Sequence, residues 1–185
     1  RGYDVELQLD YENLGSFDKV FISKVFMDTE IPFENEDKSL KTEATIAEFY
    51  KDNPILKLPN VKYGGTGFFY DKSPKLSDEI EHHMPDYHLY DEWVAEQKRQ
   101  GVKSKDLVWY TDFSIGFTTR GCVRKCQFCV NKNYNRCSLH SPLEEFVDDS
   151  RPMICLLDDN IFACPNWKQV FDELIATGKA FQFRQ

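Results

Sequence analysis

Three of the six cysteines in the chain lie within eight positions, in the segment GCVRKCQFC at residues 121–129. Cys122 and Cys126 are separated by three residues, and Cys126 and Cys129 by two. Clustered thiols in a chain without a secretory signal more often bind metal or act in redox chemistry than form disulfides. The fold must therefore hold this short loop on a framework that brings three sulfur atoms to one place.

The residues from about Leu107 onward alternate between strand-like and helix-like segments. We expect a strand within 107–121, a helix over 141–149 with Ser141 as N-cap, a buried strand over 151–160, an amphipathic helix over 166–179 and a strand over 180–183. The amphipathic helix has Trp167, Val170, Phe171, Leu174 and Ile175 on one face and Gly178 as its C-cap. This order predicts the beginning of a parallel βα array, with the cysteine loop at the carboxyl end of its first strand.

The N-terminal part predicts a small α/β arrangement. Strands are expected over 3–9 and 17–26 (buried), and a short strand running into a glycine turn over 60–68, with a helix over 41–52. The glycines at 64, 65 and 67 are more typical of a turn than of a ligand loop, since neither G-x-G-x-x-G nor a Walker lysine is present. Residues 71–106 are charged, include a short helix over 90–101, and are expected to be a linker.

Composition narrows the class of protein. The net charge of −8 over 185 residues argues against a general polyanion-binding surface, although a local basic patch for RNA remains compatible with it. No apolar run approaches the roughly 18 residues of a membrane helix, so no membrane partner is expected. Six cysteines without a signal sequence favour a cytoplasmic protein. The start at Arg1 and the strand-like end suggest a piece of a longer chain.

The cysteine loop resembles the signature of the radical S-adenosylmethionine (SAM) enzymes, C-x3-C-x-aromatic-C, with Phe128 in the aromatic position. The resemblance implies that Cys122, Cys126 and Cys129 hold three irons of a [4Fe–4S] cluster and that Phe128 lies beside the adenine of SAM. Three thiolates leave the fourth iron without a cysteine, open to a small molecule.

A second segment, LLDDNIF at residues 156–162, resembles one found in radical SAM enzymes with an N-terminal cobalamin-binding-type domain. This likeness implies that Asp158, Asp159 and Asn160 lie near the ribose or amino end of SAM. It also implies three parts: a partial Rossmann-like domain over 1–70, a linker over 71–106, and the first βα units of a partial TIM barrel over 107–185. No D-x-H-x-x-G segment provides a histidine for cobalamin, so cobalamin binding is left open without support.

The family chemistry is reductive cleavage of SAM to methionine and a 5′-deoxyadenosyl radical, driven by a flavodoxin- or ferredoxin-type reductant. Methylation, methylthiolation and rearrangement are the reaction classes implied. The substrate, a small molecule or an RNA, cannot be named from these residues.

Two other interpretations remain. Cys137 could join the three clustered cysteines in a closed zinc site of a nucleic-acid-binding module, or the chain could be an inactive remnant of a radical SAM protein. Cys155 is expected in the core, and Cys164 is expected to be an unligated thiol. The histidines at 82, 83 and 88 are expected at the surface. Basic residues near the thiols (Arg120, Arg124, Lys125, Lys132, Arg136) could offset an anionic cluster, dock a partner, or simply be solvated.

Overall fold

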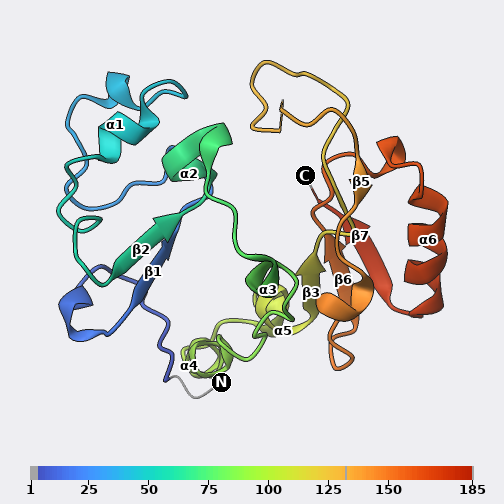
Figure 1. The fold of residues 1–185 in the computed structure, drawn as a ribbon. Helices are drawn as coiled ribbons and strands as arrows, with labels where there is room; N and C mark the ends of the chain where they lie inside the picture. Colours follow the sequence, from blue (N-terminus) through green and yellow to red (C-terminus); the bar gives the residue numbers. More distant parts are fainter. Residues whose placement is uncertain (1–3, 132, 185) are drawn as a thin grey trace. The chain divides into compact units, whose positions relative to one another are not determined.

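The chain forms two compact units in the computed structural model, which describes residues 4–131 and 133–184 (Figure 1). The N-terminal unit comprises residues 8–76; the C-terminal unit comprises residues 77–184 together with 4–7. Both contain parallel strands and helices, so the fold is mixed α/β with parallel sheets, as the sequence predicts. Most of the segment expected as a linker, 71–106, is part of the C-terminal unit; the predicted domain boundaries themselves stay a prediction.

The N-terminal unit is built on one pair of parallel strands, β1 (Val20–Ser23) and β2 (Val61–Gly64). Two short helices, α1 (Ile46–Tyr50) and α2 (Thr66–Phe69), contribute buried apolar side chains to its core. Phe68 of α2 is fully buried, with its ring 5.0 Å from that of Tyr50. Aromatic edge contacts of this kind supply much of the packing in a unit with so little regular structure.

Two strand predictions in this unit need correction. Residues 4–9 alternate apolar and polar side chains but form no strand, and Val5 and Leu9 are 64% and 71% exposed. The strand expected over 17–26 is limited to β1 and is not buried on both faces, since Phe21 is 73% exposed. The turn after β2 does need glycine: Gly65 has a φ of 102°, and a Cβ there would lie 2.2 Å from the carbonyl oxygen of Lys24.

Glu34 is the centre of a buried ionic network in the N-terminal unit, with a side chain only 3% exposed. Its carboxylate accepts hydrogen bonds from Lys38 at 2.8 Å, Lys41 at 3.1 Å, the Tyr50 hydroxyl at 2.9 Å and the Ile31 N–H at 3.2 Å. Burial alone would raise the pKa of Glu34, but these donors outweigh it and lower the pKa to about 2.

Lys24 belongs to the same network. Its ammonium group lies 3.5 Å from Glu34, donates to the Met27 carbonyl at 3.2 Å and contacts the Tyr50 hydroxyl. Burial, helped by the nearby charge of Lys41, lowers the pKa of Lys24 to about 8. Burial and the hydrogen bond to Glu34 raise the pKa of Tyr50, so the phenol stays protonated and donates to the carboxylate.

This network predicts that acid weakens the N-terminal unit. Glu34 titrates near about 4.3 in an unfolded chain and about 2 in the folded one. Because the folded pKa is the lower, the stabilisation is complete above the unfolded value and is lost as the pH falls towards 2. The shift corresponds to roughly 3 kcal/mol. We expect the free energy of unfolding to drop by about that amount between about pH 5 and pH 2, measured by urea titration of β1 and β2 NMR resonances.

The matched variants are Glu34→Gln and Glu48→Gln. Glu34→Gln should remove this part of the pH dependence and lower stability at neutral pH, because a neutral amide replaces the charged acceptor. Glu48 is 71% exposed on α1, so its replacement should change stability by less than about 0.5 kcal/mol. A wild-type unfolding free energy for this unit that is equal at both ends of the pH range would contradict the role assigned to Glu34.

The C-terminal unit contains a three-stranded parallel sheet in the order β3 (Phe113–Gly116), β6 (Met153–Leu156), β7 (Ala180–Phe183). Helix α6 (Trp167–Ala176) connects β6 to β7 and lies along the sheet (Figure 1). Its apolar side packs Val170 and Leu174 into a core with Ile154 and Leu156 of β6. These strands, their parallel pairing and this helix confirm the predicted order, with Gly178 closing the helix at a φ of 67°.

Other elements complete this unit. They are α3 (Asp78–Glu81), α4 (Asp91–Arg99), α5 (Val108–Thr111) and the antiparallel pair β4 (Thr119–Arg120) and β5 (Ser138–Leu139). Gly101 follows α4 with a φ of 89°, as predicted for its C-cap. Among the described residues, no helix has both the length and the apolar character needed to span a bilayer.

Two details of the predicted array are wrong. The helix expected over 141–149 is only a 3₁₀ turn, Leu143–Glu145, preceded by Pro142 rather than Ser141 as its cap. The chain leaves that turn because Phe146 packs directly over Gly116 and the Asp148 N–H donates to the Ser114 hydroxyl at 3.0 Å. Ile175, expected on the buried face of α6, is 65% exposed.

Candidate metal and cofactor site

The three clustered cysteines lie on one loop, residues 121–137, that connects β4 to β5. The two short strands pair through Thr119 with Leu139 and Arg120 with Ser138, which closes the base of the loop. Because β4 comes two residues after β3 ends, the loop extends beyond the carboxyl end of the parallel sheet (Figure 1). Binding sites in βα folds are built at this end.

The segment that follows β6 fastens the start of the loop. The carboxylate of Asp159 accepts a hydrogen bond from the Gly121 N–H at 2.9 Å and another from the side-chain amide of Asn131. The side-chain amide of Asn160 donates to the sulfur of Cys122 at 3.4 Å. Asp159 and Asn160 therefore lie at the cysteine loop, and their predicted contacts with SAM stay a prediction.

Gly121 allows this close approach. Its φ of 97° favours glycine, and a Cβ on it would lie 2.4 Å from the carbonyl oxygen of Arg136, two residues before β5. Any side chain here would push apart the two ends of the loop. Gly121 and Asn131 are positioning residues that motif spacing alone did not identify.

Backbone N–H groups are aimed at two of the three sulfur atoms. Arg124 N donates to Cys122 Sγ and Asn131 N donates to Cys129 Sγ, each at 3.4 Å. The Cys129 N–H donates to the Cys126 carbonyl at 3.1 Å, which makes a tight turn across Phe128. N–H donors that point at cysteine sulfurs are also available to a cluster bound by those sulfurs.

All three cysteines are free and half-buried, so their sulfur atoms can be reached from outside. In the part of the chain that the structure describes, no three His, Cys, Asp or Glu side chains converge to hold a single metal ion. A cubane cluster poses a different requirement, because each thiolate binds a different iron and the sulfurs surround a volume rather than one point. The soft donor set and its accessibility fit such a cluster.

Phe128 is 83% exposed between Cys126 and Cys129. An aromatic ring in the solvent next to a polar loop offers a flat apolar surface, which suits stacking on a planar base. Its predicted contact with adenine stays a prediction.

Asp158 has a structural position that the sequence did not predict. It is 1% exposed, and its carboxylate accepts four hydrogen bonds: from Thr118 N–H at 3.1 Å and its hydroxyl at 2.8 Å, and from the Thr119 N–H and its hydroxyl at 2.6 Å. These bonds tie the end of β6 to the start of β4. A carboxylate bonded in this way holds the start of β4 in place, and the predicted contact of Asp158 with SAM stays a prediction.

The other three cysteines are buried. Cys155 is a small core residue of β6, as predicted, at 1% exposure. The thiol of Cys137 hydrogen-bonds with Thr119 and Cys164, and its burial raises its pKa. A buried thiol with a raised pKa is a poor metal ligand, which weakens the interpretation that uses Cys137 to close a zinc site.

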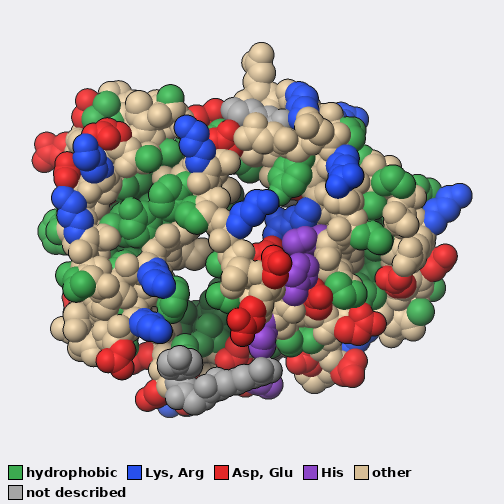
Figure 2. All heavy atoms as spheres, viewed as in Figure 1, with side chains coloured by type: hydrophobic (Ala, Val, Ile, Leu, Met, Phe, Trp, Pro, Cys, Tyr) green, Lys and Arg blue, Asp and Glu red, His purple; other side chains and the backbone are tan. Residues whose placement is uncertain are grey.

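Two of the basic side chains near the loop, Arg120 and Lys125, have partners. Arg120 lies 3.5 Å from Glu81 and stacks 3.3 Å from the centre of the Phe117 ring, and Lys125 donates to Asn135 at 2.9 Å. Lys132 lies outside the described residues. Figure 2 shows basic and acidic side chains interspersed on the visible face, an arrangement unlike the extended basic surface that binds nucleic acid nonspecifically.

The predicted surface histidines are at or near the surface, and they have partners. His82 contacts Glu145 at 2.7 Å, which raises the pKa of its imidazole; His88 contacts Asp91 at 2.8 Å with the same consequence. A fourth histidine, which the sequence pattern did not single out, joins this region: His140 lies 3.1 Å from Glu81. The His140–Glu81 pair connects α3 to the residue that follows β5, at the base of the cysteine loop.

Comparison with known proteins places the chain in no family. No family model matches it, and neither the curated proteins nor the solved structures contain a significant match. Any functional assignment therefore depends on the residues of the chain itself.

Proposed function

We propose that this chain belongs to a radical SAM enzyme and holds a [4Fe–4S] cluster through Cys122, Cys126 and Cys129. The observation that carries the proposal is the half-buried C-x3-C-x2-C loop, with Phe128 in its aromatic position, fastened beyond the carboxyl end of a parallel sheet. Three soft ligands at an accessible loop suit a cluster with one open iron.

The chain's own residues orient this site. Asp159 and Asn160 hold Gly121 and Cys122 in place, so the first ligand is fixed relative to β6. The exposed ring of Phe128 provides a stacking surface for the adenine of SAM. When bound, the reduced cluster supplies the electron that cleaves SAM into methionine and a 5′-deoxyadenosyl radical.

The finer fold assignment belongs to the same proposal. The β3–β6–β7 sheet would be the start of a partial TIM barrel over residues 107–185, and β1 and β2 would belong to a partial Rossmann-like domain over 1–70. No residue supports cobalamin binding. A flavodoxin- or ferredoxin-type reductant, a small-molecule or RNA substrate and a cytoplasmic location follow from the family resemblance alone.

The test is anaerobic reconstitution of the chain with ferrous iron and sulfide, followed by incubation with SAM and dithionite. We expect a brown protein with roughly four irons per chain and 5′-deoxyadenosine detected by mass spectrometry. A colourless protein that takes up zinc and rejects iron would overturn the proposal. A chain that binds the cluster but makes no 5′-deoxyadenosine would be the inactive remnant.

A further inference from the structure

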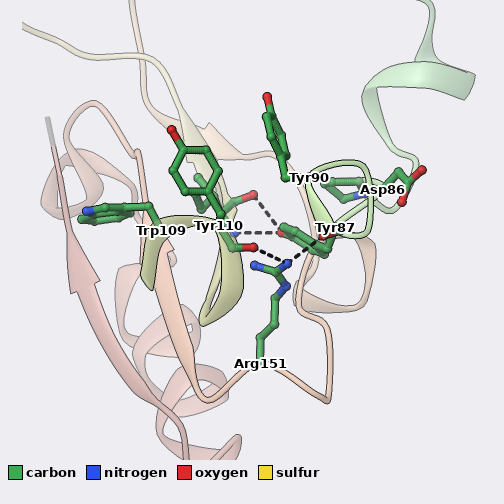
Figure 3. A pocket seen from close by; sticks show the side chains of 8 residues that line it. Asp86, Tyr87, Tyr90, Trp109, Tyr110 and Arg151 are labelled. Atoms are coloured by element: carbon green, nitrogen blue, oxygen red, sulfur yellow. Dashed lines mark hydrogen bonds between the residues drawn. The ribbon is translucent and has the colours of Figure 1, made fainter. Parts of the chain in front are cut away.

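A second candidate site lies in the C-terminal unit, at the end of the β3–β6–β7 sheet opposite to the cysteine loop. It is a pocket of about 350 Å³ whose walls include Tyr87, Tyr90, Trp109 and Tyr110, with Arg151 at its base (Figure 3). Trp109 and Tyr110 belong to α5, ahead of β3, and Arg151 comes just before β6. The pocket is therefore built on the amino ends of two strands whose carboxyl ends face the cysteines. Its volume is in the range of small-molecule sites, about 300–1,000 Å³.

The aromatic walls are held in place by contacts of their own. The Tyr87 hydroxyl donates to the Phe146 carbonyl at 2.7 Å and accepts from the Ile115 N–H at 2.8 Å. Trp109 stacks on Phe113 with ring centres 4.3 Å apart and planes 13° apart. Walls that are fixed before a ligand arrives lower the entropic cost of binding.

The base of the pocket is cationic. Arg151 is only 6% exposed, and its guanidinium donates to the carbonyl oxygens of Phe113, Tyr87 and Tyr110 at 2.8–2.9 Å. These three bonds use three of its five N–H groups; the other two bond to no residue that the structure describes. Within the described ranges, no carboxylate lies within 4.0 Å of this buried charge.

A second guanidinium lies near one wall of the pocket without lining it. Arg184 lies 4.3 Å above the ring of Trp109, and Arg151 lies 4.3 Å from the ring centre of Tyr87. The one acidic side chain at the pocket, Asp86, points its carboxylate to the outside in Figure 3 and accepts from the His88 N–H at 3.0 Å. Aromatic faces combined with guanidinium charge favour a flat ligand that is negatively charged.

We propose that this pocket binds a small planar aromatic carboxylate. The ring of the ligand packs against the tyrosine side chains, because Phe113 and Arg184 already cover the ring of Trp109, and its carboxylate neutralises the guanidinium of Arg151. A cationic ligand is repelled by both arginines, and a neutral one gains no ionic contact with Arg151. The site does not depend on the function proposed for the cysteine loop.

The test is isothermal titration calorimetry of the chain with 2-naphthoate, 2-naphthamide and 2-naphthylmethylamine. These probes share one ring system and differ in charge. We expect the carboxylate to bind at least about tenfold more tightly than the amide, because a hydrogen bond to a charged group is worth about 1.5 kcal/mol or more. The amine should show no binding. Added salt should lower the affinity for the carboxylate, because it screens the ionic contact.

Three variants test the proposal further, and none of them removes Arg151 or its hydrogen bonds to the backbone. Arg184→Gln should weaken 2-naphthoate and leave 2-naphthamide unchanged, and Tyr90→Ala should weaken both. Phe162→Ala is the matched control, because this ring is 68% exposed in the same unit and lies outside the pocket. Equal affinity for all three probes, no binding of the carboxylate at millimolar concentration, or unchanged affinity in Tyr90→Ala would each overturn the proposal.

Discussion

Alanine at any one of Cys122, Cys126 or Cys129 is expected to abolish the reconstituted iron–sulfur absorbance and the formation of 5′-deoxyadenosine. A cluster held by three thiolates cannot spare one, because the open iron is already without a protein ligand. None of the remaining three cysteines is expected to substitute, because Cys137, at the end of the same loop, is buried, as are Cys155 and Cys164. The effect is measured by the iron and sulfide content, the visible absorbance of the cluster and the yield of 5′-deoxyadenosine.

The controls are Cys137→Ala and Cys155→Ala. Both remove a buried thiol from the same unit, at 3% and 1% exposure, so they carry the same risk of a small loss of stability. Neither should change the iron content. If Cys137→Ala lost its metal together with the three loop variants, four cysteines would share one closed site, and the zinc interpretation would replace the cluster.

The sequence predicted the C-terminal unit well wherever local pattern and tertiary packing agree. Helix α6 has apolar side chains at helical spacing and a glycine after its last turn, and it forms where expected between two predicted parallel strands. The predicted apolar face was too wide: Ile175 was expected on it and is 65% exposed, while Val170 and Leu174 are buried. Periodicity identifies an amphipathic helix, but it does not show how many of the apolar side chains pack against the sheet.

The errors arise where distant residues decide the local structure. The alternation at residues 5–9 is strand-like, but a strand needs a partner for its backbone groups, and none is formed there. The segment 141–149 has a good helix start, yet Ser114 and Gly116 of β3 draw Asp148 and Phe146 into other contacts after one turn. The local pattern of a single sequence does not reveal such contacts between distant residues.

The candidate site divides in the same way. Spacing places the three cysteines on one loop, because short separations constrain where side chains can go. The roles of Asp158 and Asp159 could not be told apart from the sequence, since both are carboxylates at the end of one strand. Their partners, Thr118, Thr119 and Gly121, are about 40 positions earlier in the chain and determine which carboxylate is buried.

Asp158→Ala is expected to destabilise the C-terminal unit by roughly 3–5 kcal/mol, the largest effect on stability that the structure predicts. The substitution leaves four donors of Thr118 and Thr119 without their acceptor in a fully buried position. It also frees the start of β4, so the cysteine loop should become more sensitive to protease. All three tryptophans, at positions 93, 109 and 167, are in this unit, so urea unfolding followed by tryptophan fluorescence measures the change directly.

Two further variants separate this structural role from a contact with SAM. Asp172 is an exposed carboxylate on α6, and Asp172→Ala should shift the unfolding free energy by less than about 0.5 kcal/mol. Asp158→Asn keeps the size of the side chain, but its amide N–H₂ group faces the N–H and hydroxyl donors of Thr118 and Thr119. It should therefore still lose about half of the stability lost in the alanine variant. If both Asp158 variants unfolded at the wild-type urea concentration and differed only in SAM affinity, the carboxylate would be a ligand contact and the fastening of β4 to β6 would need another explanation.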